Sequence, residues 1–256
     1  MNAIESTVML LAFAMLRYLP VLAIPALSPL SWAPAMVRIA LLLALAWLTV
    51  LASPAAFIAT PRAFDAATVL LGCTSELLLG LTFGLAILLP QAGMGFAARL
   101  ADMQAGLSAA SLFNPGGQHE PESMLGTIVL LAATVLFFSL DLHLQLFRLL
   151  TGSVQVLPLG ALGIRLDLDG FFGMVGSGFL LGMAVVAPVI IGLFAVDMAV
   201  AYATRSMPQA NVYFLALPLK VAVALMLLAM TLAFAPMLMG RLYEDAFARL
   251  PMVIGG

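Results

Sequence analysis

Charged residues are scarce in this chain of 256 residues. Only 9% of the residues are Asp, Glu, Lys or Arg, whereas 64% are hydrophobic. Soluble domains carry about 25% charged residues, so this chain has too few charges to cover a water-facing surface. The scarcity excludes an ordinary soluble enzyme. The 10 basic residues are offset by 12 acidic ones and form no basic run, which argues against a nucleic acid as a partner.

Cysteine and histidine are almost absent as well. The single cysteine, Cys73, cannot form an internal disulfide, and two histidines do not complete a Cys/His zinc site. The sequence also lacks GxSxG, HExxH, Walker and CxxC motifs. We therefore expect no enzymatic activity, no metal site and no cofactor.

Long apolar runs take the place of these features. A helix that crosses the hydrocarbon core of a membrane needs about 20 mostly apolar residues. The distances between charges predict six such helices, over residues 5–27, 36–58, 66–90, 124–147, 170–202 and 211–240. We expect an all-α integral membrane protein with about six long, kinked hydrophobic helices, forming one unit over residues 1–256. More arginines fall on the side that holds both termini, which favours cytoplasmic termini.

Four charged residues interrupt the apolar runs or border them: Arg17, Glu76, Asp197 and Lys220. A charge at the bilayer centre costs about 2.5–3.5 kcal/mol on insertion scales, so such groups usually face protein or water. They could line an ion or proton pathway, or they could form buried pairs within or between subunits. Pairing is favoured because each helix offers one charge instead of a row of acids. Asp197 and Lys220 lie on consecutive helices, which predicts a pair between them.

Glycine and proline positions predict how these helices pack. Glycines four residues apart let neighbouring helices approach closely, and this spacing occurs for Gly80 with Gly84 and for Gly178 with Gly182. Pro188 lies inside the fifth predicted helix and predicts a kink there.

The segment over residues 91–121 departs most from a plain membrane bundle. An apolar stripe at helical spacing is flanked by Arg99 and Asp102, which are close enough for a local ion pair. Leu112 and Phe113 then precede a turn sequence, Asn-Pro-Gly-Gly. One interpretation is an interfacial amphipathic helix followed by a solvated loop. The other is a mobile apolar plug, in which Leu112 and Phe113 close a passage.

Four stretches of the chain, taken in order, resemble the FliR family of export-gate subunits, which includes the SctT proteins of injectisomes. They are SWAPAMVR at 31–38; QAGLS at 104–108 continuing to LFNP at 112–115; DLHLQLFR at 141–148 closing with LPLG at 157–160; and Asp197 with Arg205, followed by PQANV at 208–212 and LPLK at 217–220. In the last stretch Pro208, Gln209, Asn211 and Pro218 match the family motif. Their order and spacing over about residues 10–240 make the resemblance specific. Asn114 and Leu142 depart from the Asp and Gly that members often have there.

The resemblance implies a subunit of the flagellar type III protein export gate, needed for flagellum assembly. Its expected partners are FliP- and FliQ-like gate subunits, FlhB- and FlhA-like proteins, and the unfolded flagellar subunits that cross through the gate. The expected location is the bacterial inner membrane, at the flagellar basal body. Neighbouring subunits instead of lipid would then satisfy the charges of Arg17, Glu76, Asp197, Arg205 and Lys220.

The resemblance also assigns the plug to residues 106–117. Its residues would be Gly106, Leu107, Leu112, Phe113, Asn114 and Pro115, with Leu112 and Phe113 as the blocking side chains. An apolar constriction excludes water and ions when it is shut and binds no passing polypeptide tightly.

Two alternatives stay open at this stage. An injectisome subunit of the SctT type fits the same stretches, although DxHxxLxR with LPLG resembles the flagellar branch more closely. A secondary transporter for a small solute could also be built on six apolar helices. Such transporters carry inverted repeats, and the two halves of this chain share no pattern beyond their hydropathy.

Overall fold

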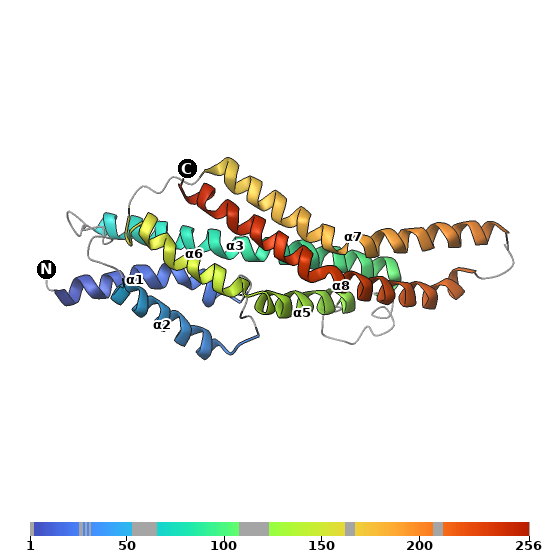
Figure 1. Ribbon diagram of the computed structural model, residues 1–256, viewed down its shortest axis with the longest axis horizontal. Coiled ribbons are helices and arrows are strands. Elements are labelled where there is room, and N and C mark those ends of the chain that lie inside the picture. Colours follow the sequence, from blue (N-terminus) through green and yellow to red (C-terminus); the bar gives the residue numbers. More distant parts are fainter. Residues whose placement is uncertain are drawn as a thin grey trace. The chain divides into compact units, whose positions relative to one another are not determined.

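The computed structural model describes residues 3–25, 28, 30, 32–52, 66–107, 123–161, 167–206 and 212–255, which form seven α-helices (Figure 1). They are α1 (Ala3–Leu22), α2 (Ala35–Ala52), α3 (Ala66–Ala105), α5 (Met124–Ser139), α6 (Leu142–Val156), α7 (Leu168–Ser206) and α8 (Val212–Gly255). The expected all-helical fold is confirmed over these residues.

The helices have the length and hydropathy of membrane spans. Five of those described are long and apolar enough to cross a bilayer, and α5 with α6 would make a sixth if the two form one broken span. Mean hydropathy of these five ranges from 1.4 in α1 to 2.7 in α7. The predicted number of about six spans agrees with the five or six helices that meet these criteria.

Two predicted helix ends were wrong. The third helix continues past Pro90 to Ala105, and the last one continues to Gly255. An interior proline removes one hydrogen bond and bends a helix without having to end it. Beyond Pro90 the buried residues Met94, Ala97 and Ala101 keep the helical spacing, so packing sustains the helix.

The predicted helix over 124–147 is in fact two helices, α5 and α6. The break falls at Asp141, whose φ of 55° is left-handed, a conformation that Asp tolerates better than most residues. The carbonyl of Asp141 then accepts hydrogen bonds from the amides of Leu144 and Gln145, which start α6.

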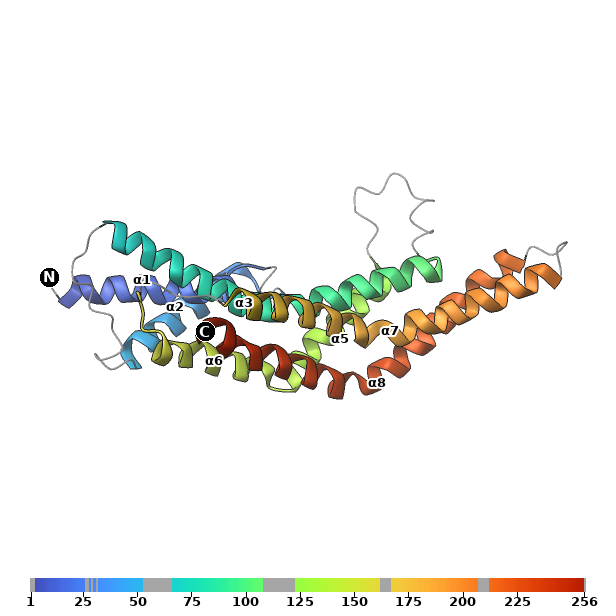
Figure 2. The same ribbon diagram turned by 90° about the horizontal axis from the view of Figure 1, so that it is seen from above.

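The chain divides into two compact units, each with its own apolar core. Unit 1 comprises Met1–Leu88, Asp141–Gly176 and Tyr243–Gly256. In this unit α1 and α2 lie side by side in both views (Figures 1 and 2), joined by a 2.8 Å hydrogen bond between Tyr18 Oη and Thr49 Oγ1. Helix α6 turns one face inward, with buried residues four apart at Leu142, Leu146, Leu150 and Val154.

Unit 2 comprises Leu89–Leu140 and Ser177–Leu242. Its α5 buries Leu125, Val129, Ala133 and Phe137, again at a spacing of four. The end of α7 and the beginning of α8 run side by side in both views (Figure 2).

Glycines set the closest helix contacts. In unit 2 a Cβ at Gly93 would lie 2.3 Å from the carbonyl oxygen of Phe179, and one at Gly182 would lie 2.3 Å from that of Pro90. Helices α3 and α7 therefore pack with their backbones in direct contact at these glycines. In unit 1 a Cβ at Gly80 would lie 2.3 Å from the carbonyl oxygen of Arg17. The predicted close approach is confirmed at Gly80 and Gly182.

Candidate functional site

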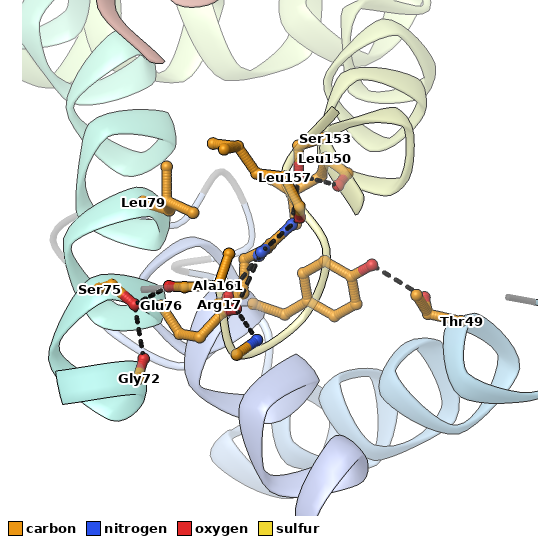
Figure 3. A network of polar contacts seen from close by, with 12 residues as sticks. Arg17, Thr49, Gly72, Ser75, Glu76, Leu79, Leu150, Ser153, Leu157 and Ala161 are labelled. Carbon is orange, nitrogen blue, oxygen red and sulfur yellow. Dashed lines mark hydrogen bonds and ion pairs between the residues drawn. The ribbon is translucent and has the colours of Figure 1, made fainter. Parts of the chain in front are cut away.

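A buried ion pair lies at the centre of unit 1. Arg17 of α1 and Glu76 of α3 face each other with both side chains 0% exposed (Figure 3). Arg17 Nε donates to Glu76 Oε2 at 2.5 Å, and Arg17 Nη2 donates to Oε1 at 2.9 Å. This two-pronged geometry is the strongest arrangement that a guanidinium and a carboxylate can form.

Three further hydrogen bonds extend the pair to α6 and the turn after it. Arg17 Nη1 donates to Ser153 Oγ at 3.1 Å, and Nη2 donates to the carbonyl of Leu157 at 3.0 Å. Glu76 Oε1 accepts the amide of Gly160 at 2.8 Å. Gly160 has a φ of +77°, and a Cβ there would lie 2.8 Å from the ring of Phe13, so glycine is required. One charge pair thus joins three helices, α1, α3 and α6, and the turn over residues 157–160.

Ser75, next to Glu76, adds a contact to the same turn. Its hydroxyl lies 2.8 Å from the carbonyl oxygen of Gly72 and 3.1 Å from that of Ala161 (Figure 3). The polar groups of this network are directed at one another and away from solvent, which suits a structural support better than an ion pathway.

A second polar cluster lies in unit 2, where α3, α7 and α8 meet. Lys220 Nζ and Asp197 Oδ1 form an ion pair, with the side chains 8% and 33% exposed. Gln104 Nε2 donates to Asp197 Oδ2 at 3.3 Å. The predicted pairing of Asp197 with Lys220 is confirmed. Arg205 differs from them, because it lies exposed in the last turn of α7.

These pairs correct one expectation. The resemblance placed the partners of the buried charges on neighbouring subunits, but Arg17, Glu76, Asp197 and Lys220 find their partners within the chain. A charge left alone in an apolar interior is strongly destabilising, so internal pairing lets each unit fold with Arg17, Glu76 and Lys220 buried.

Asp102, near the end of α3, joins the two helices that border residues 108–122. Its carboxylate accepts hydrogen bonds from Ser123 Oγ and from the amide of Leu125, at 3.1 Å for Oδ1. Ser123 in turn caps α5 by accepting the amide of Gly126 at 2.9 Å. The expected ion pair between Asp102 and Arg99 is absent from the described residues. Helix capping takes the carboxylate instead.

Gly106 ends α3 in a defined way. With a φ of +80° it follows the last helical residue, and its amide donates to the carbonyl of Met103 at 3.2 Å. The amide of Leu107 donates to the carbonyl of Asp102 at 3.1 Å, which completes a Schellman motif.

Several predicted site residues lie outside the described residues. These are the plug residues Leu112, Phe113, Asn114 and Pro115, together with the motif residues Pro208, Gln209 and Asn211. Gly106 and Leu107 are the two predicted plug residues that lie within the described ranges. Pro218 lies exposed in α8, two residues before Lys220.

Reasoning from the sequence missed four polar contributors: Gln104, Ser123, Ser153 and Gly160. Ser123 carried a usable signal, since a serine just before an apolar helix is a typical N-cap. Gln104 and Gly160 stand inside stretches that carried the family resemblance, without any pattern that names their partners. Ser153 is separated from Arg17 by 136 residues, which no local spacing predicts.

The described residues contain no group of three or more metal-ligating side chains. The polar groups of the two ion-pair clusters bind one another, and the cap at Ser123 binds a helix end. In the part of the chain that the structure describes, these clusters therefore support the helices.

Comparison with known proteins supplies the context. The chain matches the model of the family described as bacterial export proteins, family 1, over residues 8–246. It is 27% identical to the flagellar biosynthetic protein FliR of Pectobacterium carotovorum over 210 residues, which cover 81% of this chain and 79% of that protein. It is 31% identical to the Yop proteins translocation protein T of Yersinia pestis over 169 residues, covering 64% of each chain, just under two thirds. The FliR of Escherichia coli K12 is 26% identical over 70% of this chain and 69% of its own length.

Proposed function

The chain belongs to the bacterial export proteins, family 1, and from this membership we infer that it is a subunit of a type III protein export gate. The match over residues 8–246 carries the inference, because it takes in nearly all of the apolar helices. The relatives are export-apparatus proteins and not known enzymes.

We propose the flagellar gate as its place. The relatives named FliR include those of Pectobacterium carotovorum and Escherichia coli K12, and the stretch at 141–148 with LPLG at 157–160 resembles the flagellar branch. Arg17 and Glu76 form hydrogen bonds to the backbone of the LPLG turn, so packing in unit 1 restricts the residues that this turn can contain. An injectisome subunit is the alternative, supported by the similarity to the Yop translocation protein T.

Deletion of the gene from the source bacterium tests the assignment. The flagellar proposal predicts loss of motility and of hook-protein secretion, with both restored by a plasmid-borne copy. Loss of injectisome secretion with normal motility would instead support the SctT-type alternative.

We propose that the chain lies in the inner membrane and assembles with FliP- and FliQ-like subunits, beside FlhB- and FlhA-like proteins. Large apolar side chains remain exposed along α2, α7 and α8, including Met36, Ile191 and Phe234 at 82%, 66% and 69%. Such surface requires lipid or another protein to cover it. Copurification with FliP and FliQ homologues in detergent tests the assembly. A lone chain that is stable and moves a small solute in proteoliposomes would support a transporter instead.

We further propose that residues 106–117 form the plug of the gate, with Leu112 and Phe113 as the blocking side chains. The Schellman motif at Gly106 supports the proposal, because it ends α3 at the predicted beginning of the plug. Phe113→Ala in the assembled gate is expected to raise ion conductance in planar bilayers. Phe214→Ala, a change at an exposed phenylalanine of α8, serves as the matched control. Equal conductance of the two variants would refute the plug.

A further inference from the structure

Arg38, in the first turn of α2, is a buried cation that no carboxylate of the described residues pairs with. The residue is 9% exposed, and its Nη1 donates to the carbonyl oxygen of Ala23 at 3.1 Å. Its Nε is buried and has no hydrogen-bond partner. Within the described ranges no carboxylate forms an ion pair with it. Arg17 and Lys220, the other buried cations there, each bind a carboxylate.

The surroundings of Arg38 favour an anion. Helix α2 begins at Ala35, so its first amides lie at the same end as Arg38. The amides of Val37 and Arg38 donate to the carbonyl of Pro34, which leaves those of Ala35 and Met36 without a partner in the described ranges. Helical side chains lean toward the N-terminus of their helix, which brings the guanidinium toward these amides. The helix dipole makes this end partly positive. A single anion would satisfy the free amides at this end and pair with the charge of Arg38.

The rest of α2 indicates which anion this is. Only one face of the helix is buried, formed by Arg38, Leu42, Ala46 and Thr49, whereas the other faces expose apolar side chains. Arg38 is the one charged residue among the 18 of this helix, which has a mean hydropathy of 2.2. A surface this apolar suits acyl chains better than a polar protein partner or water.

Trp32 adds the second indication. It lies just before α2 and is 69% exposed. A tryptophan and an arginine together at one end of an apolar span are typical of the headgroup level of a membrane. Trp47, the other tryptophan of the chain, is 49% exposed and lies nine residues beyond Arg38. At the helical rise this places it about 14 Å deeper along α2.

We propose that Arg38 and the N-terminal turn of α2 bind the phosphodiester of a membrane phospholipid, whose acyl chains lie along the exposed faces of α2. The site goes beyond export itself, so its failure would leave the gate assignment standing. The competing occupant is a carboxylate from a neighbouring gate subunit, which would cover α2 with protein.

Fluorescence depth measurements test the position of α2. The full chain, copurified with its gate partners, is placed in vesicles of phosphatidylethanolamine and phosphatidylglycerol brominated at defined acyl positions. The variants Trp32→Phe and Trp47→Phe each leave one native tryptophan, Trp47 within α2 or Trp32 just before it, provided that the partners' own tryptophans are replaced. We expect deep bromines to quench Trp47 and shallow ones to quench Trp32. Protection of both tryptophans from bromine would show a protein cover and overturn the proposal.

Native mass spectrometry tests the phosphate contact. The full chain in detergent is incubated with phosphatidylglycerol, and the bound lipid is counted for Arg38→Gln and Arg38→Lys. Loss of a charge-assisted hydrogen bond is expected to weaken retention about tenfold in Arg38→Gln, with a smaller loss in Arg38→Lys. Arg148→Gln, at an exposed position of α6, is the matched control and should retain lipid as the parent does. Circular dichroism verifies that each variant is helical.

Two results would overturn the phosphate contact. One is equal retention by folded Arg38→Gln and the parent chain. The other is a crosslink from position 38 to an acidic residue of a gate partner. Displacement of the lipid by inorganic phosphate alone, at equal concentration, would show a site for free phosphate and would also refute a lipid site.

Discussion

The carboxylate of Asp102 accepts the hydroxyl of Ser123, and through this bond the end of α3 holds the beginning of α5. The same carboxylate accepts the amide of Leu125, so it satisfies one of the free amides of α5 as well. The two residues flank positions 108–122.

We expect Asp102→Asn to lower the free energy of unfolding by about 1–3 kcal/mol, because a buried amide is left without its charged acceptor. The free energy can be followed by thermal unfolding of the full chain in detergent. Ser123→Ala should cost about 1 kcal/mol as the loss of an N-cap. Since the two side chains touch, the double variant should cost less than the sum of the single ones. Strict additivity would contradict the contact.

The ion pair of Arg17 with Glu76 should not tolerate exchange of its charges. Arg17→Gln leaves a buried carboxylate without its cation, which is expected to cost about 3–5 kcal/mol. The double variant Arg17→Glu with Glu76→Arg restores opposite charges but is expected to stay unfolded. A carboxylate at 17 would face the carbonyl of Leu157, and a guanidinium at 76 would face the amide of Gly160.

Yield and size-exclusion profile of the purified chain measure this outcome, with Arg148→Gln at an exposed site as the control. Full recovery in the exchanged double variant would show that charge alone matters at this site and that the turn contacts contribute nothing.

The pair of Asp197 with Lys220 should behave in the opposite way. Either single reversal places like charges side by side and is expected to abolish export. Exchange of both charges is expected to restore it, because Asp197 is one-third exposed and Gln104 can present either its amide nitrogen or its oxygen. Secretion of hook protein by complemented cells provides the measurement. An inactive double variant, present at normal levels, would contradict a simple pairing role.

The contrast between these pairs shows what the sequence reveals. Long charge-free runs predicted apolar helices directly, because a bilayer allows few other structures. Asp197 and Lys220 lie on consecutive helices, so their closeness in the sequence was enough to predict the pair. Glu76 is 59 residues from Arg17, and its bond to Gly160 spans 84 residues. Such contacts depend on packing between distant segments, which no local periodicity records.

Helix boundaries were missed for a related reason. A proline at position 90 locally favours the end of a helix, but α3 continues through it. The residues on either side of Pro90 pack against α7, where Gly182 admits the carbonyl of Pro90 at close range. Burial of that contact outweighs the lost hydrogen bond of one proline.

That contact gives the final prediction. Gly182→Ala would place a Cβ 2.3 Å from the carbonyl oxygen of Pro90, and backbone atoms cannot move aside as a flexible side chain can. We expect α3 and α7 to separate and the thermal stability of the chain to fall, with an overpacking cost of about 1–3 kcal/mol. Gly176→Ala is the matched control in the same helix, because a Cβ there meets nothing within 4 Å. It should stabilise the chain by up to about 1 kcal/mol through helix propensity. Equal melting temperatures for the two variants would mean that α3 and α7 do not meet at Gly182.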